Sequence, residues 1–517
     1  MRTARRSAPV RTGTDSPGSD RGSSEPGPSD AVSPASTTPE AGPVPGARPG
    51  RAARPEPLTP SVLVLTALAV LGSLTGWAAV AVVTQPWLVS DDGGPVFHLD
   101  AWIYRTAVEQ WRAGGSLYDW WVFPAEHMLP FTYPPFAAWA LTPLTWVDHE
   151  LSQTLLTVAT PVAVAVTIWA CLRSVLPGDP LRSAGRRGPG LPRPVVLAVA
   201  VPWLTVVSVA LVEPVYKTME YGQVNAVLMA LVAVDLLVVP RGSRWRGVLS
   251  GLAAAFKLTP AIAVLVLLAR REWRAAATMV AGALVVTVGA AVASPSESWQ
   301  FFSRAMWDPT RAGNADYAGN QNLRAVLARA WPTSLPEHGT SLVWAAVVAA
   351  SIVGAWLLLR RLEPTGVHGR GRTDAEVPGG RGGSTVGDPV GGGLAEGRAG
   401  VDPAEGTVPL LQVSVTMVLG LLISPISWSH HWVWAVPALI ALVAAAIRWR
   451  RVSLLAVAGG GGVVYLLAAH WWFTEGNHIE RDWPWWQQLL GSSYTWWALG
   501  AGVVVGLTLR HDRVPTP

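Results

Sequence analysis

Asp100 is the residue of this sequence best suited to acid–base chemistry. It lies in the polar segment 98–105, HisLeuAspAlaTrpIleTyrArg, which follows the first long apolar stretch. A carboxylate beside a bilayer is more often functional than incidental, and it can accept a proton from an attacking hydroxyl group. The alternative is a solvated acid in a surface loop with no chemical part. The polar residues elsewhere in the chain favour the chemical role.

Side chains suited to a ligand with phosphate and hydroxyl groups follow at intervals along the chain. Lys257 carries a charge that suits a phosphate, and its LysLeuThrPro segment breaks the apolar stretch 247–269 into two half-length helices. Gln223 and Asn225 begin another apolar stretch, where unpaired amides would be costly in lipid. The candidate binding residues are Tyr133, Gln223, Asn225, Lys257, Asn320, Gln321, Arg324, His430 and His431.

This set of residues suits the transfer of a sugar from a lipid-linked phosphate. The departing phosphate is a stable anion near neutral pH, so the reaction needs no general acid and one carboxylate is enough. Asp100 would take the proton from the acceptor hydroxyl. Lys257, together with Arg324 or a histidine, would offset the charge on the departing phosphate.

Each candidate also has a purely structural interpretation. Gln223 and Asn225 could satisfy hydrogen bonds between helices, and Lys257 could extend its charge to the membrane interface without a ligand. The two histidines could be core groups bonded to the backbone, and the tryptophans at 428–434 and 471–486 could form an interfacial belt. All of these together would require unrelated coincidences on one face of the molecule.

The composition indicates an integral membrane protein. Of the 517 residues, 50% are hydrophobic and 14% are charged, and the apolar residues form runs long enough to cross about 30 Å of hydrocarbon. The net charge of +5 fits basic segments that face the cytoplasm better than nucleic-acid binding, because the chain has no soluble basic domain. The membrane segments should be helices, since only helices and closed barrels satisfy the backbone in lipid.

The arginine clusters set the expected topology, since positive residues favour the cytoplasmic side. They predict about twelve membrane segments and an external face that carries Asp100 and the other polar segments. The expected segments are 61–83, 151–172, 194–213, 222–240, 247–257 with 258–269, 273–293, 341–361, 409–427, 430–447, 452–470 and 494–509. The stretch 134–147 is too short for a comfortable span, so it either dips into the membrane and returns or marks an error in one boundary.

Polar segments of loop composition flank and divide the membrane domain. Residues 1–56 are rich in Ser, Pro, Gly and Arg and should form a disordered cytoplasmic tail. The Gly-rich stretch 363–406 should be a flexible cytoplasmic insert, and 512–517 a short tail. The membrane domain then has an N-terminal part, 57–362, with the first external loop at 84–133, and a C-terminal part, 407–511.

Several kinds of soluble-enzyme chemistry have no signal in the sequence. It contains no Walker or dinucleotide glycine motif, no HisGluXXHis, no serine-hydrolase elbow and no internal repeat. The one cysteine, Cys171, lies in an apolar run, so no disulfide can form within the chain and a thiol metal site is not expected. The histidine pair lacks the third ligand of a metal site. We expect neither a metal nor a cofactor.

At the polar segments the sequence resembles glycosyltransferase family 87. The matching segments, in order, are HisLeuAspAlaTrpIleTyrArg, ThrTyrProProPhe, TyrGlyGlnValAsn, PheLysLeuThrPro, GlyAsnGlnAsnLeuArg and SerProIleSerTrpSerHisHisTrp. They look like the ordered motif series of this family, which comprises actinobacterial GT-C-type mannosyltransferases that use polyprenyl-phosphate mannose and commonly form α-(1→2) linkages. The resemblance covers roughly residues 60–510, without the insert 363–406.

The resemblance implies a fold, a reaction and a set of partners. The fold would be an all-α, GT-C-like bundle with a catalytic first external loop, whose aspartate matches Asp100. The reaction would be an inverting transfer at the outer face of the plasma membrane. The partners would be a polyprenyl-phosphate sugar donor, the lipid bilayer, and a glycolipid or mannan acceptor such as a phosphatidylinositol mannoside, lipomannan or lipoarabinomannan.

Two other functions fit parts of the sequence. A transporter or flippase of lipid-linked sugars would also have broken helices with polar groups at mid-membrane depth, but this chain has no two-half repeat. A non-catalytic subunit that binds polyprenyl phosphate is the third possibility. The intact carboxylate of Asp100 argues against it.

Overall fold

The computed structural model describes residues 98–123, 128–176, 193–331, 337–362 and 404–511. This part of the chain is almost entirely helical, so the predicted all-α membrane protein is confirmed. The predictions for 1–56, 61–83, 512–517 and most of 363–406 fall outside the described residues.

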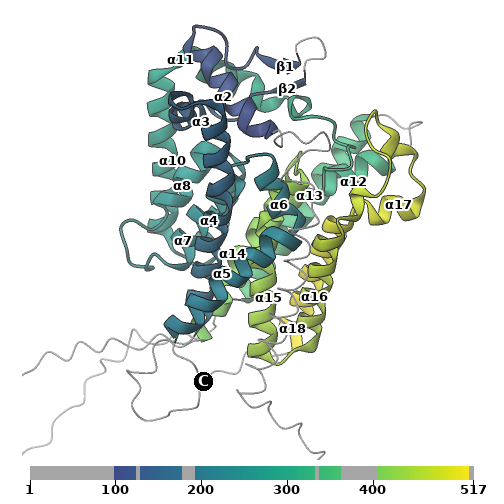
Figure 1. Ribbon diagram of the computed structural model, residues 1–517. Coiled ribbons are helices and arrows are strands. Elements are labelled where there is room, and N and C mark those ends of the chain that lie inside the picture. Colours follow the sequence, from purple (N-terminus) through teal and green to yellow (C-terminus); the bar gives the residue numbers. More distant parts are fainter. Residues whose placement is uncertain (1–97, 124–127, 177–192, 332–336, 363–403, 512–517) are drawn as a thin grey trace, which may run out of the picture. The chain divides into compact units, whose positions relative to one another are not determined.

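The elements follow one another in the order drawn in Figure 1. The α-helices are α2 (Leu99–Arg112), α3 (Pro135–Leu141), α4 (His149–Val175), α5 (Arg193–Leu211), α6 (Glu213–Glu220), α7 (Asn225–Leu237), α8 (Val248–Phe256), α9 (Val264–Ala269), α10 (Trp273–Ala293), α11 (Pro295–Ser303), α12 (Leu323–Ala330), α13 (Glu337–Arg361), α14 (Ala404–Ile423), α15 (Ala435–Trp449), α16 (Val452–Leu467), α17 (Trp485–Leu490) and α18 (Ser493–His511). Short 3-10 helices are η2 (Thr142–Trp146), η4 (Thr259–Ala263), η5 (Ala305–Trp307), η6 (Pro309–Ala312), η7 (Ser429–Trp434), η8 (Ala469–Trp471) and η9 (Ile479–Asp482). An antiparallel pair, β1 (Trp121–Phe123) and β2 (Met128–Pro130), is the one sheet in the described part.

Seven of the described helical segments are long and apolar enough to cross a membrane, and three shorter apolar ones accompany them. The long segments are His149–Val175, Arg193–Leu211, Trp273–Ala293, Gly339–Arg361, Gly406–Ile423, Ser429–Trp449 and Val452–Trp471. The shorter ones are Asn225–Leu237, Thr259–Ala269 and Ser493–Leu509. The predicted count of about twelve is therefore not confirmed over the described residues. The stretch 134–147 forms only the short helices α3 and η2.

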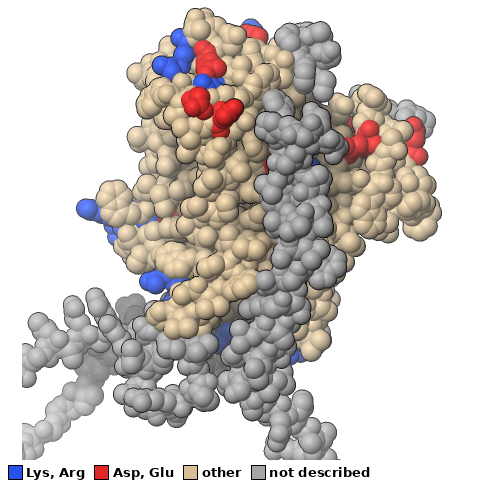
Figure 2. All heavy atoms as spheres, viewed as in Figure 1, with Lys and Arg blue, Asp and Glu red and all other residues tan. Residues whose placement is uncertain are grey.

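The exposed surface of the long helices is apolar, as a lipid-facing surface should be. On α10, Val285 and Val292 are 71% and 79% exposed, and Val288 is 57% exposed. In Figure 2 the charged side chains gather toward the end of the molecule with α2 and α11, near α12 and α17, and at the turn between α7 and α8, with mostly uncharged surface between them.

Helix α7 is central to the part of the fold that carries the polar residues. It packs against α4, α8 and α14, and most of its side chains are buried, including Leu228, Met229 and Val232. Helix α8 in turn packs along α10. Because α7 is enclosed in this way, the residue at its N-terminus, Asn225, is held in a fixed place.

The turn between α7 and α8 is fastened by Asp235, a buried carboxylate near the end of α7. Its two oxygens accept hydrogen bonds from the backbone N–H groups of Gly247 and Ser250, at 2.7 and 2.8 Å. These N–H groups belong to the first turn of α8, which has no partners for them within the helix. The carboxylate therefore caps the start of α8 from the neighbouring helix.

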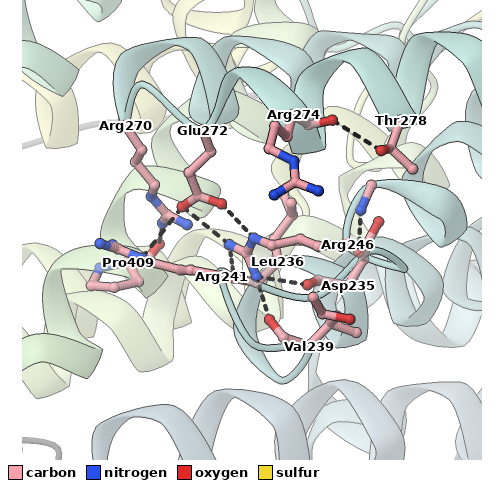
Figure 3. Close-up of polar contacts among 12 residues, drawn as sticks. Asp235, Leu236, Val239, Arg241, Arg246, Arg270, Glu272, Arg274, Thr278 and Pro409 are labelled. Atoms are coloured by element: carbon pink, nitrogen blue, oxygen red, sulfur yellow. Dashed lines mark hydrogen bonds and ion pairs between the residues drawn. The ribbon is translucent and has the colours of Figure 1, made fainter.

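Arg246 fastens the same turn from the other direction. Figure 3 shows its guanidinium among the last backbone carbonyls of α7, where it donates to the carbonyl oxygens of Asp235 (3.0 Å) and Leu236 (3.2 Å). Glu272 pairs with the same guanidinium and with Arg241. A cation at a helix C-terminus satisfies the free carbonyls and the helix dipole. Arg241 and Arg246, which belong to an arginine cluster predicted to be cytoplasmic, thus also stabilise the turn between α7 and α8.

The structure adds detail to two of the predicted segments. The described residues of the predicted first external loop, 84–133, include α2 and both strands, and α2 lies beside α3 and α4 (Figure 1). Helix α14 begins at Ala404, so the last residues of the predicted insert belong to a membrane helix. The positions of these helices and strands depend on tertiary packing, which cannot be predicted from local composition.

Candidate active site

Helix α2 brings Asp100 directly onto the turn between α6 and α7. The backbone N–H groups of Asp100 and Ala101 both donate to the carbonyl oxygen of Tyr221, at 3.0 and 3.1 Å. The next residue, Gly222, has a φ of +66°, and a Cβ there would lie 2.6 Å from the Cβ of Ala101. A glycine is therefore required for this close approach. Asp100 is fixed next to the segment that carries Gln223 and Asn225.

Lys257 reaches the same place from the break between two helices. Helix α8 ends at Phe256, Lys257 is extended, and η4 begins at Thr259, so the predicted interruption is confirmed. Its Nζ donates to Asn225 Oδ1 at 2.9 Å and lies 3.3 Å from His431 Nε2. It also lies 5.1 Å from the centre of the Tyr133 ring. Three other predicted binding residues therefore meet around this cation.

Tyrosine hydroxyls join Gln223 to this group. The Gln223 Oε1 atom accepts hydrogen bonds from Tyr104 (2.6 Å) and from Tyr133 (3.2 Å), and the two hydroxyls lie 2.9 Å apart. All three side chains are buried. Tyr104 was not among the predicted binding residues, although it stands four residues after Asp100 and so on the same face of α2. The helical spacing would have pointed to it.

The half-buried carboxyl group of Asp100 titrates close to neutrality. Burial raises the pKa of Asp100 from 3.8 to about 6, while a hydrogen bond from the Gln223 side chain and the positive charge of Lys257 act in the opposite direction. A general base is most effective when its pKa lies near the working pH. Asp100 is thus ionised at pH 7 and can hold a proton at a small cost.

The histidine pair lies between Tyr221 and Lys257. The His430 ring meets the Tyr221 ring edge-on at 5.1 Å and the His431 ring at 4.8 Å. The backbone carbonyl of His430 accepts hydrogen bonds from Thr218 (2.8 Å) and Asn225 (3.2 Å). Among the described residues, His430 Nε2 has no hydrogen-bond partner although it is buried. The pair thus offers a ring nitrogen to a ligand.

Comparison of the sequence with known proteins identifies the family of this chain. The family model described as glycosyltransferase family 87 matches residues 131–373. A polyprenol-phosphate-mannose-dependent alpha-(1-2)-phosphatidylinositol mannoside mannosyltransferase of Mycobacterium tuberculosis is 32% identical over 439 residues, which cover 82% of this chain and 88% of that protein. The chain belongs to glycosyltransferase family 87. It is therefore a membrane glycosyltransferase.

Two further relatives of this family 87 enzyme come from Mycolicibacterium smegmatis. A protein of the same description is 32% identical over 418 residues, covering 80% of this chain and 84% of that protein. A polyprenol-phosphate-mannose-dependent alpha-(1-2)-phosphatidylinositol pentamannoside mannosyltransferase is 27% identical over 409 residues, covering 77% and 80%. No solved structure matches the chain.

In this family 87 enzyme the amides of Asn320 and Gln321 bond to the backbone. Asn320 accepts from the N–H of Ser427 at 2.9 Å and donates to the carbonyl of Ala315 at 2.8 Å. Gln321 Nε2 donates to the carbonyls of Ala318 (2.9 Å) and Gly491 (2.7 Å). The Asn320 amide thereby holds the segment before α12 against the segment before η7, and the Gln321 amide holds it against the segment before α18. This placement favours a supporting role in building the histidine segment.

Arg324 lies apart from the Lys257 group. Its guanidinium lies 5.8 Å from the centre of the Trp344 ring on α13. Burial lowers its pKa, and within the described part of the chain no hydrogen bond or ion pair joins it to Asp100 or Lys257. Of the two cations predicted to face a phosphate, the structure thus brings only Lys257 to the carboxylate.

Glu213 is a buried carboxylate that was not among the residues predicted from the sequence. It accepts hydrogen bonds from Ser429 (2.7 Å), from Trp471 (2.7 Å) and from Tyr494 (2.8 Å). Burial raises its pKa. Because Ser429 precedes His430, Glu213 anchors the histidine segment. Among the described residues, no group of three His, Cys, Asp or Glu side chains could hold a metal ion.

Proposed function

We propose that this glycosyltransferase moves a mannosyl group from polyprenyl-phosphate mannose to a hydroxyl group of an envelope glycolipid or mannan. The acceptor class is that of the phosphatidylinositol mannosides named in its relatives, and the new bond is an α-(1→2) linkage formed with inversion. The observation that carries the proposal is the convergence of Asp100 and Lys257, a carboxylate and a cation from separate helices, on one set of amide and tyrosine groups.

The chemical step needs one base and one charge partner. The Asp100 carboxylate takes the proton of the acceptor hydroxyl while the hydroxyl oxygen attacks the anomeric carbon of the donor. The bond between that carbon and the phosphate oxygen breaks, and its electron pair leaves with the polyprenyl phosphate. Since this leaving group is already a stable anion, no second carboxylate is required.

Lys257 is the residue proposed to hold the donor phosphate. An ammonium group in an apolar surrounding costs about 2.5–3.5 kcal/mol on insertion scales unless an anion or water receives it. In the described structure Lys257 Nζ lies 2.9 Å from Asn225 Oδ1, 3.3 Å from His431 Nε2 and 3.5 Å from the Tyr133 hydroxyl, and the charge of Asp100 acts on it without a direct ion pair. A phosphate there would gain charge-assisted hydrogen bonds, which are about twice as strong as neutral ones.

The remaining predicted residues are proposed to orient the substrates or to build the site. Gln223, Tyr133 and Asn225 offer oxygen and nitrogen atoms next to Lys257. The free Nε2 atom of His430 and the ring of His431 are proposed to contact donor oxygens. The arginine pattern supports a site at the external face of the plasma membrane, since the Arg246 cluster lies at the opposite ends of α7 and α8 from Asn225 and Lys257.

The proposal can be tested with membranes that contain the protein, radiolabelled polyprenyl-phosphate mannose and a phosphatidylinositol mannoside acceptor. We expect label to move into the acceptor and the new bond to be cleaved by an α-(1→2)-specific mannosidase. Movement of labelled donor across the bilayer without transfer would indicate a flippase. Donor binding without transfer or movement would indicate a binding subunit. Either of these results would overturn the proposed function.

A further inference from the structure

A second group of polar and aromatic side chains lies on the side of the histidine pair opposite Lys257. It consists of Lys217, Tyr221, Tyr317, Trp428 and Trp471, which we call the Lys217 patch. Lys217 Nζ lies 5.3 Å from the centre of the Tyr221 ring and 5.7 Å from that of Trp471. The Tyr317 ring lies 5.8 Å from Trp428 and 6.2 Å from Trp471. All five side chains are half-buried, so each keeps a surface open to a ligand.

The rings of the patch are held in place from within the protein. The indole N–H of Trp471 donates to the fully buried Glu213 carboxylate at 2.7 Å, which fixes the orientation of that ring. The close approach of Trp471 and Tyr317 requires Gly319, because a Cβ there would lie 3.0 Å from each of the two rings. A platform that is fixed before binding loses little side-chain entropy when a ligand arrives.

The patch is joined to the residue Asp100 by a backbone hydrogen bond. The carbonyl of Tyr221 accepts the N–H of Asp100 at 3.0 Å, and the Tyr221 ring contacts His430. His430 contacts His431, which lies 3.3 Å from Lys257. The charge of Lys257 therefore acts on the Asp100 carboxylate, and Lys217 is linked to Asp100 through Tyr221, whose ring it contacts and whose carbonyl binds the Asp100 N–H. A base that takes a proton from the acceptor must stand between the donor and the acceptor.

The chemistry of the patch suits a sugar that carries an anion. Aromatic faces bind the C–H faces of sugar rings, and an ammonium group binds a phosphodiester. Among the described residues, Glu220 is the hydrogen-bond acceptor of Lys217 Nζ, at 2.9 Å, and an ammonium carries three donors. Glu475, which accepts from the Tyr317 hydroxyl at 3.2 Å, adds a carboxylate that sugar hydroxyls can reach.

An interfacial aromatic belt explains these features less well. Tryptophans of a belt stand in the lipid interface, as expected of Trp485, which is 77% exposed. In the Lys217 patch the rings instead surround a paired cation, and one ring is tied to a buried carboxylate. A buried carboxylate with three hydrogen-bond donors costs free energy to desolvate, so it marks a place where position matters.

We infer that the Lys217 patch binds the acceptor, with the sugar ring on Trp471 and Tyr317 and a phosphodiester of the same glycolipid at Lys217. This inference rests on the proposed function and deepens it, because it assigns the anionic phosphoinositol headgroup of the acceptor to one side of Asp100 and the donor phosphate to Lys257 on the other.

The test compares two acceptors in wild-type and variant enzyme, with polyprenyl-phosphate mannose as donor. One acceptor is a phosphatidylinositol mannoside and the other is an uncharged alkyl mannoside. Lys217→Gln should raise the KM for the charged acceptor about tenfold and leave the uncharged acceptor unaffected, since one charge-assisted contact is lost. Trp471→Ala should raise the KM for both acceptors, and Trp471→Phe should recover part of the loss. The KM for the donor should stay constant in all three variants.

Trp485→Ala is the matched control, because it removes an exposed tryptophan outside the patch. If the wild-type enzyme transfers no mannose to either acceptor, the proposed function fails. If it does transfer mannose, and Lys217→Gln keeps the wild-type KM for the charged acceptor or weakens the donor equally, the acceptor assignment is overturned while the proposed function stands. Lys217 is half-exposed, so its replacement tests the inference even if Trp471→Ala fails to fold.

Discussion

Lys257 donates a hydrogen bond of 2.9 Å to Asn225, a residue 32 positions earlier in the chain. The contact joins the C-terminal end of α8 to the N-terminal end of α7. The opposite ends of the same two helices are locked by Asp235 and Arg246 (Figure 3). The two helices thus form an antiparallel pair fixed at both ends, and this pair determines where the cation stands relative to Asp100.

Lys257→Gln should weaken donor binding and slow transfer. Loss of a charged hydrogen bond is worth about 1.5–3 kcal/mol, so the donor KM should rise about 10- to 100-fold. Lys257→Arg should keep part of the affinity, because the charge remains but its geometry changes. Donor titration and thermal unfolding should be measured together. A Gln variant with wild-type kinetics would show that Lys257 holds no phosphate.

Arg324→Gln should change donor affinity much less than Lys257→Gln does. The guanidinium of Arg324 lies on the Trp344 ring, and its loss removes a cation–π contact of about 0.5–2 kcal/mol. The expected result is a lower unfolding temperature with a donor KM within a few-fold of wild type. A rise in donor KM equal to that of Lys257→Gln would show that Arg324 also binds the donor phosphate.

Activity should fall as the pH drops through about 6. Burial raises the pKa of Asp100 to about 6, so the carboxylate that acts as base is lost by protonation below that value and is fully present above it. The acid limb of kcat/KM against pH measures this pKa. In Lys257→Gln the limb should move to higher pH, because the charge of Lys257 lowers the Asp100 pKa. If the acid limb of Lys257→Gln lies at the wild-type pH, the charge of Lys257 does not act on the Asp100 carboxylate.

The external placement of Asp100 can be tested by cysteine labelling. In a Cys171→Ala background, Gln110→Cys on α2 should react with a membrane-impermeant thiol reagent added outside, and Gly242→Cys in the turn between α7 and α8 should not. Both positions are exposed, so access depends on the side of the membrane. A cysteine placed within 363–406 should behave like Gly242→Cys. The reverse labelling pattern would contradict the topology predicted from the arginines.

Part of the candidate site could be recognised from residue types alone. Asp100, Gln223, Asn225 and Lys257 were recognisable because a polar group in an apolar stretch is costly, and the structure brings them together. Which side chain each polar residue contacts cannot be recognised in this way, since it depends on the tertiary fold. That is why Arg324, chosen for its charge, lies on Trp344 instead.

Glu213 and Lys217 were overlooked for a related reason. They occur in the short helix α6, whose mixed composition looks like an ordinary polar connection. Only the fold shows that the Glu213 carboxylate meets side chains more than two hundred positions further along the chain, among them Ser429 and Trp471. The predicted count of membrane segments is not confirmed over the described residues, where the segments that contain α7 and α9 are among three that are shorter than a full span.

The most direct test of the whole account is mannosyl transfer by purified Asp100→Asn. Asparagine keeps the shape of the side chain and loses the base, so transfer should fall by ~10²–10⁴ while the donor Kd and the unfolding temperature stay near wild type. Glu109→Gln, which removes an exposed carboxylate from the same helix, should retain full activity. If Asp100→Asn transfers mannose at the wild-type rate, Asp100 is not the base and the proposed mechanism is wrong.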